Sequence, residues 1–133
     1  MNTFTPLATQ IKDTNDYTVE DLQNIIATAK SEASQAASEW LAQWVESTGG
    51  NEYGEPMYCG FASVNIHGIK GNTKLGKRMK AAGLAKDYSG AYSIWNPAGY
   101  GGQSMDVKEA GASACARVLE AYGFRAYANS RAD

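Results

Sequence analysis

Apolar residues recur at helical spacing over a long stretch near the start of the chain. Between Val19 and Ser47 they return at alternating steps of four and three, and no proline or glycine interrupts them. Thr18 can cap the start of this helix, and Gly49 and Gly50 follow its end. The residues of the apolar stripe are Leu22, Ile26, Ala29, Ala33, Ala36 and Trp40, widened by Ile25, Ala37, Leu41 and Trp44.

This pattern predicts an association element at residues 18–48, preceded by a flexible arm at residues 1–17. The helix would be ~43 Å long at 1.5 Å per residue. A domain of this size has a radius of gyration near ~14 Å, so the helix would overhang it. The middle of the stripe is alanine, which allows another helix to approach closely, and we expect a homo-oligomer through 18–48. Alternatively, the helix breaks near Ser31–Ser34 and folds back on its own domain.

Beyond a turn-rich linker at residues 48–56, short apolar runs alternate with helical patterns. The order αβαβαβ predicts an α/β core at residues 57–133. We expect a small two-layer domain with a three-stranded sheet and the long N-terminal amphipathic helix. The predicted strands are Met57–Ile66, Ala91–Trp95 and Phe124–Ala128, and the predicted helices are Lys74–Ala82 and Met105–Ala121.

Composition removes several classes of protein. The 133 residues are 44% hydrophobic and 20% charged, which excludes wholesale disorder. No apolar run approaches the ~20 residues of a membrane span, and the N-terminus lacks the features of a secretory signal. Cys59, Cys115 and His67 are too few for a disulfide framework or a closed zinc site. We therefore expect a cytoplasmic protein without metal or cofactor.

The same three residues offer no nucleophile and base. Cys59 and His67 share one face of a predicted strand, but eight residues span ~26 Å at 3.3 Å per residue. A nucleophile and its base must lie within hydrogen-bonding reach. We expect no catalytic residues, and an enzyme is the least favoured class.

Charge is segregated along the chain. Residues 1–56 hold two basic and nine acidic residues, a net charge of −7, whereas residues 57–133 hold ten basic and five acidic residues, a net charge of +5. Such segregation indicates either an anionic partner for the basic part or attraction between the two parts, within or between chains.

Four cations gather on the short predicted helix Lys74–Ala82. Lys74, Lys77 and Arg78 lie at i, i+3 and i+4 on one exposed face, with Lys80 close by. These four residues are candidates for phosphate contacts, although ordinary solvated helices also carry such a face.

A glycine-rich segment between the second strand and the last helix is the best candidate for a ligand loop. Backbone N–H groups in such a position can bind a phosphate, and Trp95, Tyr100 and Gln103 can read a ring and its polar edge. However, Asp106 and Glu109 already complement the helix dipole and would repel a phosphate. The segment is otherwise an ordinary loop.

Arg131 is the last candidate. Its guanidinium can clamp a carboxylate or phosphate with two hydrogen bonds. Alternatively, Asn129–Asp133 is a solvated tail.

Part of the chain resembles a group of short, uncharacterised proteins from tailed bacteriophages. The resemblance covers residues 57–133 and implies a phage-encoded protein that works in the host cytoplasm. It carries no established function or site residue. It rests on Tyr58-Cys59-Gly60-Phe61, Trp95-Asn96-Pro97, Gln103-Ser104-Met105-Asp106, Lys108-Glu109-Ala110-Gly111-Ala112 and Ser130-Arg131-Ala132-Asp133.

These observations favour a non-enzymatic phage accessory protein that binds an anionic ligand, either nucleic acid or a nucleotide. The basic helix would contact phosphates, and the aromatic residues of the glycine-rich loop would stack on bases. The alternative is an interaction protein that inhibits a host or anti-phage defence protein, with the acidic helix as its contact surface.

Overall fold

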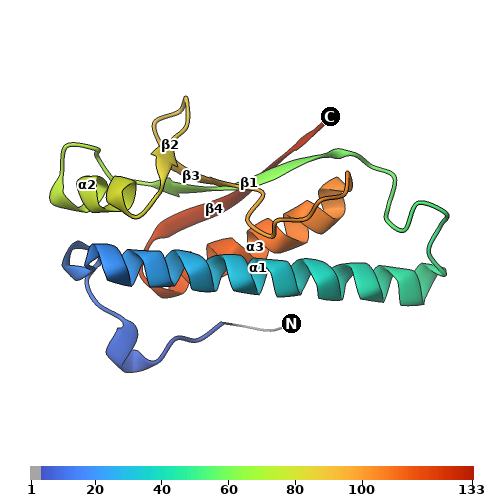
Figure 1. Ribbon diagram of the computed structural model, residues 1–133, viewed down its shortest axis with the longest axis horizontal. Helices are drawn as coiled ribbons and strands as arrows, with labels where there is room; N and C mark the ends of the chain where they lie inside the picture. The colour runs from blue at the N-terminus through green and yellow to red at the C-terminus, as the bar shows by residue number, and fades with distance from the viewer. Residues whose placement is uncertain (1–3) are drawn as a thin grey trace.

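A computed structural model describes residues 4–133. Its longest element is α1 (Val19–Thr48), an unbroken helix of 30 residues that runs along the length of the molecule (Figure 1). Thr18 and Asp21 form a capping box at its start, and Gly49 ends it with a φ of 81° that favours glycine. The alternative of a break near Ser31–Ser34 is therefore wrong.

The sheet consists of β1 (Gly60–His67), β2 (Ala85–Lys86), β3 (Tyr92–Trp95) and β4 (Arg125–Ala132), all antiparallel, in the order β2-β3-β1-β4. The prediction of three strands is wrong by one, because β2 has two residues and cannot produce a visible alternation. The segment considered as a solvated tail is instead the second half of β4, paired with the start of β1.

Helices α2 (Lys74–Ala81) and α3 (Met105–Ala121) connect the strands of the sheet. Helix α2 follows β1, and α3 joins β3 to β4. From β1 onward the order is therefore β-α-β-β-α-β. Because β3 lies between β2 and β1, and β1 lies between β3 and β4, the chain forms two interlocked split β-α-β units. Helix α1 is an addition to this arrangement.

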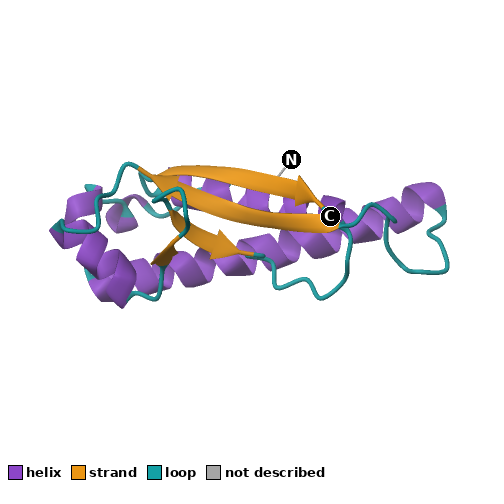
Figure 2. Cartoon of the chain, turned by 90° about the horizontal axis from the view of Figure 1, so that it is seen from above, coloured by secondary structure: helices purple, strands orange, loops and turns teal. Residues whose placement is uncertain are grey.

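Helices α1 and α3 cover one face of the sheet (Figures 1 and 2). Their contact uses the alanine seam of α1, where Ala29, Ala33 and Ala37 are buried. On α3 the matching position is Gly111, where an added Cβ would lie 3.2 Å from the carbonyl oxygen of Ala33 and 2.5 Å from the Cβ of Ala98. The close approach that the alanines allow is thus made within the chain.

The segment before α1 contributes to the core. Tyr17 is buried, and its hydroxyl donates a hydrogen bond of 2.7 Å to the carbonyl oxygen of Tyr122. Phe4 packs on the Tyr122 ring at 5.9 Å between centroids. Residues 1–3 of the predicted arm lie outside the described residues, but the part from Phe4 to Tyr17 is anchored by these rings.

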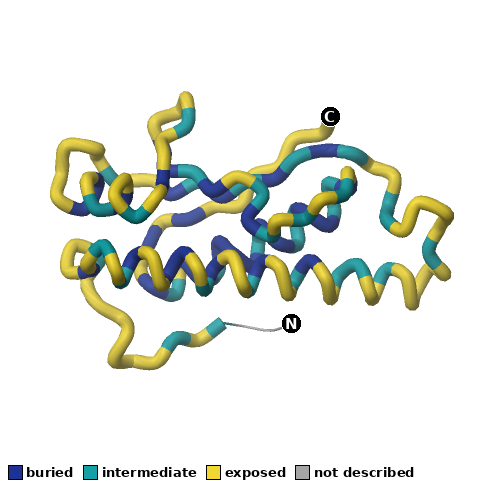
Figure 3. The backbone as a smooth tube through the Cα atoms, viewed as in Figure 1, coloured by how far each residue is buried: buried dark blue, intermediate teal, exposed yellow. Residues whose placement is uncertain are grey.

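The C-terminal end of α1 extends past α3 (Figures 1 and 3). Trp40, Leu41 and Trp44 are half-buried there, and Val45 is 42% exposed. Separately, no helix within residues 4–133 has both the length and the apolar character needed to cross a membrane.

Candidate nucleic-acid interface

Within residues 4–133 no helix covers the sheet face opposite α1 and α3, and we call it the open face (Figure 2). Side chains alternate along a strand, so the even-numbered Ala62, Val64 and Ile66 of β1 are buried under the helices. The odd-numbered residues of β1 and their partners in the register therefore share the other side. The open face consists of Phe61, Ser63, Asn65, His67, Ser93, Trp95, Arg125, Tyr127, Asn129 and Arg131.

Exposed aromatic rings occupy two places on the open face. The Trp95 side chain is 62% exposed and lies 5.3 Å from the Phe61 ring, at an interplanar angle of 34°. Tyr127 is 54% exposed and meets His67 edge-on at 5.5 Å. Exposed apolar groups that gather on one surface mark interaction sites, and each exposed ring can stack on a nucleic-acid base.

The turn between β2 and β3 forms one wall of a shallow groove of about 510 Å³ on the open face. Asp87 fixes this turn, because its carboxylate accepts hydrogen bonds from the hydroxyl and N–H of Ser89 and the N–H of Ala91. The Ser89 hydroxyl contributes most to the lowered pKa of Asp87. On the groove floor, the Oδ1 atom of Asn65 accepts no hydrogen bond from the described residues. The groove thus combines aromatic rings with available polar atoms.

Cations border the aromatic pair on the open face. Arg131 lies opposite Phe61 in the register and lines the groove. Neither Arg131 nor Arg125 forms an ion pair with a described residue. Lys108 of α3 is buried beneath, where its Nζ donates to the carbonyl oxygen of Gly60 at 3.0 Å and lies 5.3 Å from the centre of the Phe61 ring. Cationic groups therefore lie beside the aromatic rings, while the Asp87 carboxylate lines another part of the groove.

Trp95 and Arg131 are the predicted site residues that the structure brings together, since both line this groove. Sequence reasoning missed Phe61, Asn65 and Tyr127. Their alternation along predicted strands was visible, but no pattern in the sequence says which side of a strand stays uncovered. Lys108 was missed because a lysine within a small-residue helix stripe resembles a surface position.

The glycine-rich loop is occupied by an anion of the chain itself. Glu55, from the linker that precedes β1, accepts hydrogen bonds from the Tyr100 hydroxyl, from the N–H of Gln103 at 2.8 Å and from the N–H of Ser104 at 3.2 Å. Partial burial opposes ionisation of Glu55, but these hydrogen bonds and the charge of Lys108 lower its pKa overall. Burial and the Glu55 carboxylate raise the pKa of Tyr100 to about 12. The backbone amides predicted to hold a phosphate hold this carboxylate.

The cations of α2 lie apart from the groove. Lys74, Lys77 and Lys80 are exposed on a helix beyond the end of β1 (Figure 1). Arg78 has a structural position, because its guanidinium donates to the carbonyl oxygens of Asn15 at 2.8 Å and Tyr17 at 3.4 Å. The three lysines can extend an electropositive path from the open face, whereas Arg78 ties α2 to the start of α1.

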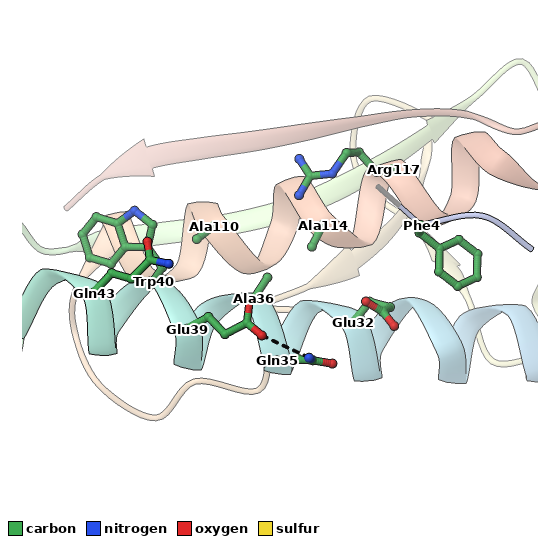
Figure 4. A pocket seen from close by; sticks show the side chains of 10 residues that line it. All are labelled: Phe4, Glu32, Gln35, Ala36, Glu39, Trp40, Gln43, Ala110, Ala114 and Arg117. Carbon is green, nitrogen blue, oxygen red and sulfur yellow. Dashed lines mark hydrogen bonds between the residues drawn. The ribbon is translucent and has the colours of Figure 1, made fainter. Parts of the chain in front are cut away.

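A second groove, of about 200 Å³, lies between α1 and α3 (Figure 4). Its floor is alanine, with Trp40 toward one end and Phe4 toward the other. Among its polar lining residues the carboxylates of Glu32 and Glu39 outnumber the single cation, Arg117, so for an anionic ligand it is a weaker candidate than the open face.

The other chemistry considered from the sequence is a reactive cysteine or a metal site. Cys115 is buried in the core, and burial raises the pKa of its thiol to about 12, far from a reactive thiolate. Among residues 4–133, no group of three or more His, Cys, Asp or Glu side chains is placed to hold a metal ion.

Comparisons of this chain with protein-family models, with curated proteins and with solved structures find no match. The resemblance to phage proteins accordingly stays a prediction, and the functional argument rests on the geometry of the open face.

Proposed function

We propose that this protein is a non-enzymatic accessory protein that binds single-stranded nucleic acid on the open face of its sheet. The observation that carries this proposal is the exposed Trp95 ring, paired with Phe61 and bordered by the unpaired guanidinium of Arg131. Bases stack on the rings, and phosphates contact the arginines.

The shape of the open face favours a single strand over other anionic ligands. Stacking on exposed rings requires bases that are free of a duplex. A free nucleotide is usually enclosed in a pocket, whereas this groove is shallow and crosses three strands. Asn65, Ser63 and Asn129 supply hydrogen-bonding atoms for base edges. These features support a strand that lies across the sheet.

The lysines of α2 extend the proposed binding surface beyond the groove. Lys74, Lys77 and Lys80 are exposed beyond the His67 end of β1. A strand that leaves the groove in that direction meets these cations, which contribute affinity through its phosphates without reading sequence.

The test is a fluorescence-anisotropy titration of a labelled oligothymidylate at low salt. Replacing Trp95 by alanine should weaken binding by ~1–3 kcal/mol, the value of one stacked base. Trp44→Ala, at the far end of α1, is the matched control and should leave affinity unchanged. Absence of binding by the unaltered protein, or equal losses in the two variants, contradicts the proposal.

The alternative role, as an interaction protein that inhibits a host or defence protein, is favoured by one observation. Tyr53, Met57 and Tyr58, in the segment that follows the acidic α1, are exposed, as is Val45 near the end of that helix. Such clusters mark protein contact surfaces. A protein that co-purifies and is lost with Tyr58→Glu, but retained with Trp95→Ala, would support this role.

A further inference from the structure

The outer edge of β4 is unusually open. β4 is the last strand at one margin of the sheet and pairs with β1 alone, in an unbroken register over eight residue pairs. Its residues from Ala128 to Ala132 are exposed. Natural edge strands are usually blunted by charged side chains, above all lysine, or by proline, a bulge or a cover. β4 contains no lysine or proline, and its register contains no bulge; its charged side chains are Arg125 and Arg131, near its two ends.

The hydrogen-bond pattern shows which backbone groups of β4 face outward. The N–H of Asp133 donates to the carbonyl oxygen of Cys59 at 3.1 Å, so odd-numbered residues of this strand bond to β1. On the other side of β1, the carbonyl oxygen of Ala62 accepts from Asn96, which agrees with this alternation. In an antiparallel ladder the even-numbered residues of β4 therefore direct their N–H and C=O groups away from β1.

We infer that the edge of β4 binds the same edge of a second copy of this chain, antiparallel, with Ala128 opposite Ser130. In this register the outward backbone groups of the two copies meet. On the open-face side, Tyr127 lies opposite Arg131 of the second copy and Asn129 opposite its own equivalent. Arg125 lies opposite Asp133. The Arg125–Asp133 pair joins opposite charges and the Tyr127–Arg131 pair sets a guanidinium beside an aromatic ring, and both kinds of pair are favourable.

Neighbouring registers are less favourable. A shift that sets Ala128 opposite Ala128 brings Arg125 against Arg131, and like charges directly opposite destabilise a pair. The opposite shift, with Ser130 opposite Ser130, separates Arg125 from Asp133 and sets Tyr127 opposite Asp133 instead of Arg131, so both favourable pairs are lost. The sequence of β4 thus matches itself best in one register, and because the pairing is antiparallel the interface is two-fold symmetric.

This dimer extends the proposed function without depending on it. Residues directly opposite in an antiparallel pair point to the same side. The two open faces therefore join into one continuous surface of twice the width, with α1 and α3 of both copies on the other side. Association through β4 does not require nucleic acid and can be tested separately.

Sedimentation equilibrium over a wide range of protein concentration tests the inference. The unaltered protein should dimerise. Ser130→Pro removes an outward N–H while every hydrogen bond to β1 remains, so this variant should be monomeric with an unchanged circular dichroism spectrum. Ser130→Ala is the matched control and should dimerise like the unaltered protein.

The Arg125–Asp133 pair tests the register. It also tests the dimer interface if the proline variant fails to fold. The dimer contains two Arg125–Asp133 pairs. The substitution Arg125→Asp replaces each of them with a pair of like charges and should weaken association by roughly ten-fold. Adding Asp133→Arg should restore it. A monomer at every concentration overturns the inference. So does a dimer unaffected by Ser130→Pro, which would place the interface elsewhere, such as the apolar end of α1. Failure of the charge swap to rescue association also overturns it.

Discussion

Glu55 joins two parts of the molecule that are far apart in sequence. Its carboxylate holds the Tyr100 hydroxyl and the backbone amides before α3, and it thereby fixes the linker from α1 against the glycine-rich loop. This carboxylate offsets the positive partial charge of N–H groups that would otherwise attract a phosphate. Glu55 is therefore the anion that the backbone amides of the glycine-rich loop bind.

Glu55→Gln should lower stability by about 1–2 kcal/mol, because the hydrogen bonds lose the charge of their acceptor. The pKa of Glu55 is depressed below its ordinary value of 4.5, so its contribution is present above that value and is lost as pH falls. Thermal melting should show a difference between the two proteins at neutral pH that shrinks on acidification. In the variant, the Tyr100 pKa should fall from about 12 toward 10.0, which ultraviolet titration measures.

A stability difference that is constant from neutral to acidic pH would contradict this account of Glu55. An unchanged tyrosine titration would contradict its contact with Tyr100. Asp106→Asn, on the same stretch of chain, is a matched control that removes a carboxylate without removing these hydrogen bonds.

Among the elements, α1 and α3 form the most extensive contact of the fold. Ala33 is fully buried and faces Gly111 across it. Association of chains through 18–48 stays a prediction, but the seam that motivated it is filled by α3. The part of α1 left for another chain is the overhanging end around Trp44.

Ala33→Glu should therefore unfold the protein instead of converting an oligomer to monomers. A carboxylate buried against α3 without a partner costs at least about 3 kcal/mol, a large part of the stability of a domain of this size. Ser34→Glu is the control, because Ser34 is exposed on the next position of α1. A folded, monomeric Ala33→Glu protein in light scattering and circular dichroism would show that the seam faces another chain.

The lysines of α2 provide a prediction about salt. Changing Lys74, Lys77 and Lys80 to glutamine should weaken binding of all single strands alike and reduce the slope of log affinity against log salt by ~0.7 for each lost contact. Arg78 is left in place because it holds Asn15 and Tyr17. Lys30→Gln, on the exposed side of α1, should leave the slope unchanged. An unchanged slope in the triple variant would show that these lysines lie on an ordinary solvated face and do not contact phosphates.

Helices were more predictable from the sequence than strands. The helix Met105–Ala121 has the predicted bounds, because Ser104 and Gly123 carry local signals that do not depend on tertiary structure. Strand β2 and the second half of β4 lack such signals. The residues Asn129–Asp133 are polar, and only pairing with β1 makes them a strand.

At the scale of the whole molecule, the position of the site depends on layering. Trp95 could be selected from the sequence as an aromatic ring beside a glycine-rich loop, and Arg131 as a guanidinium that can clamp an anion. Their meeting with Phe61 on one surface could not, since it follows from both helices lying on the other side of the sheet. Tyr100 was selected on the same grounds as Trp95, but the register leaves it in a loop where Glu55 holds it.

Fluorescence of Trp95 during binding tests the central claim most directly. The chain has three tryptophans, and the substitutions Trp40→Phe and Trp44→Phe leave Trp95 as the reporter. Titration with oligothymidylate at low salt should quench its emission, because a base stacks on the indole ring. The quenching should saturate at the same strand concentration as the anisotropy of a labelled strand. Binding detected by anisotropy with no change in Trp95 emission, or no binding at all, would contradict the open face as the nucleic-acid interface.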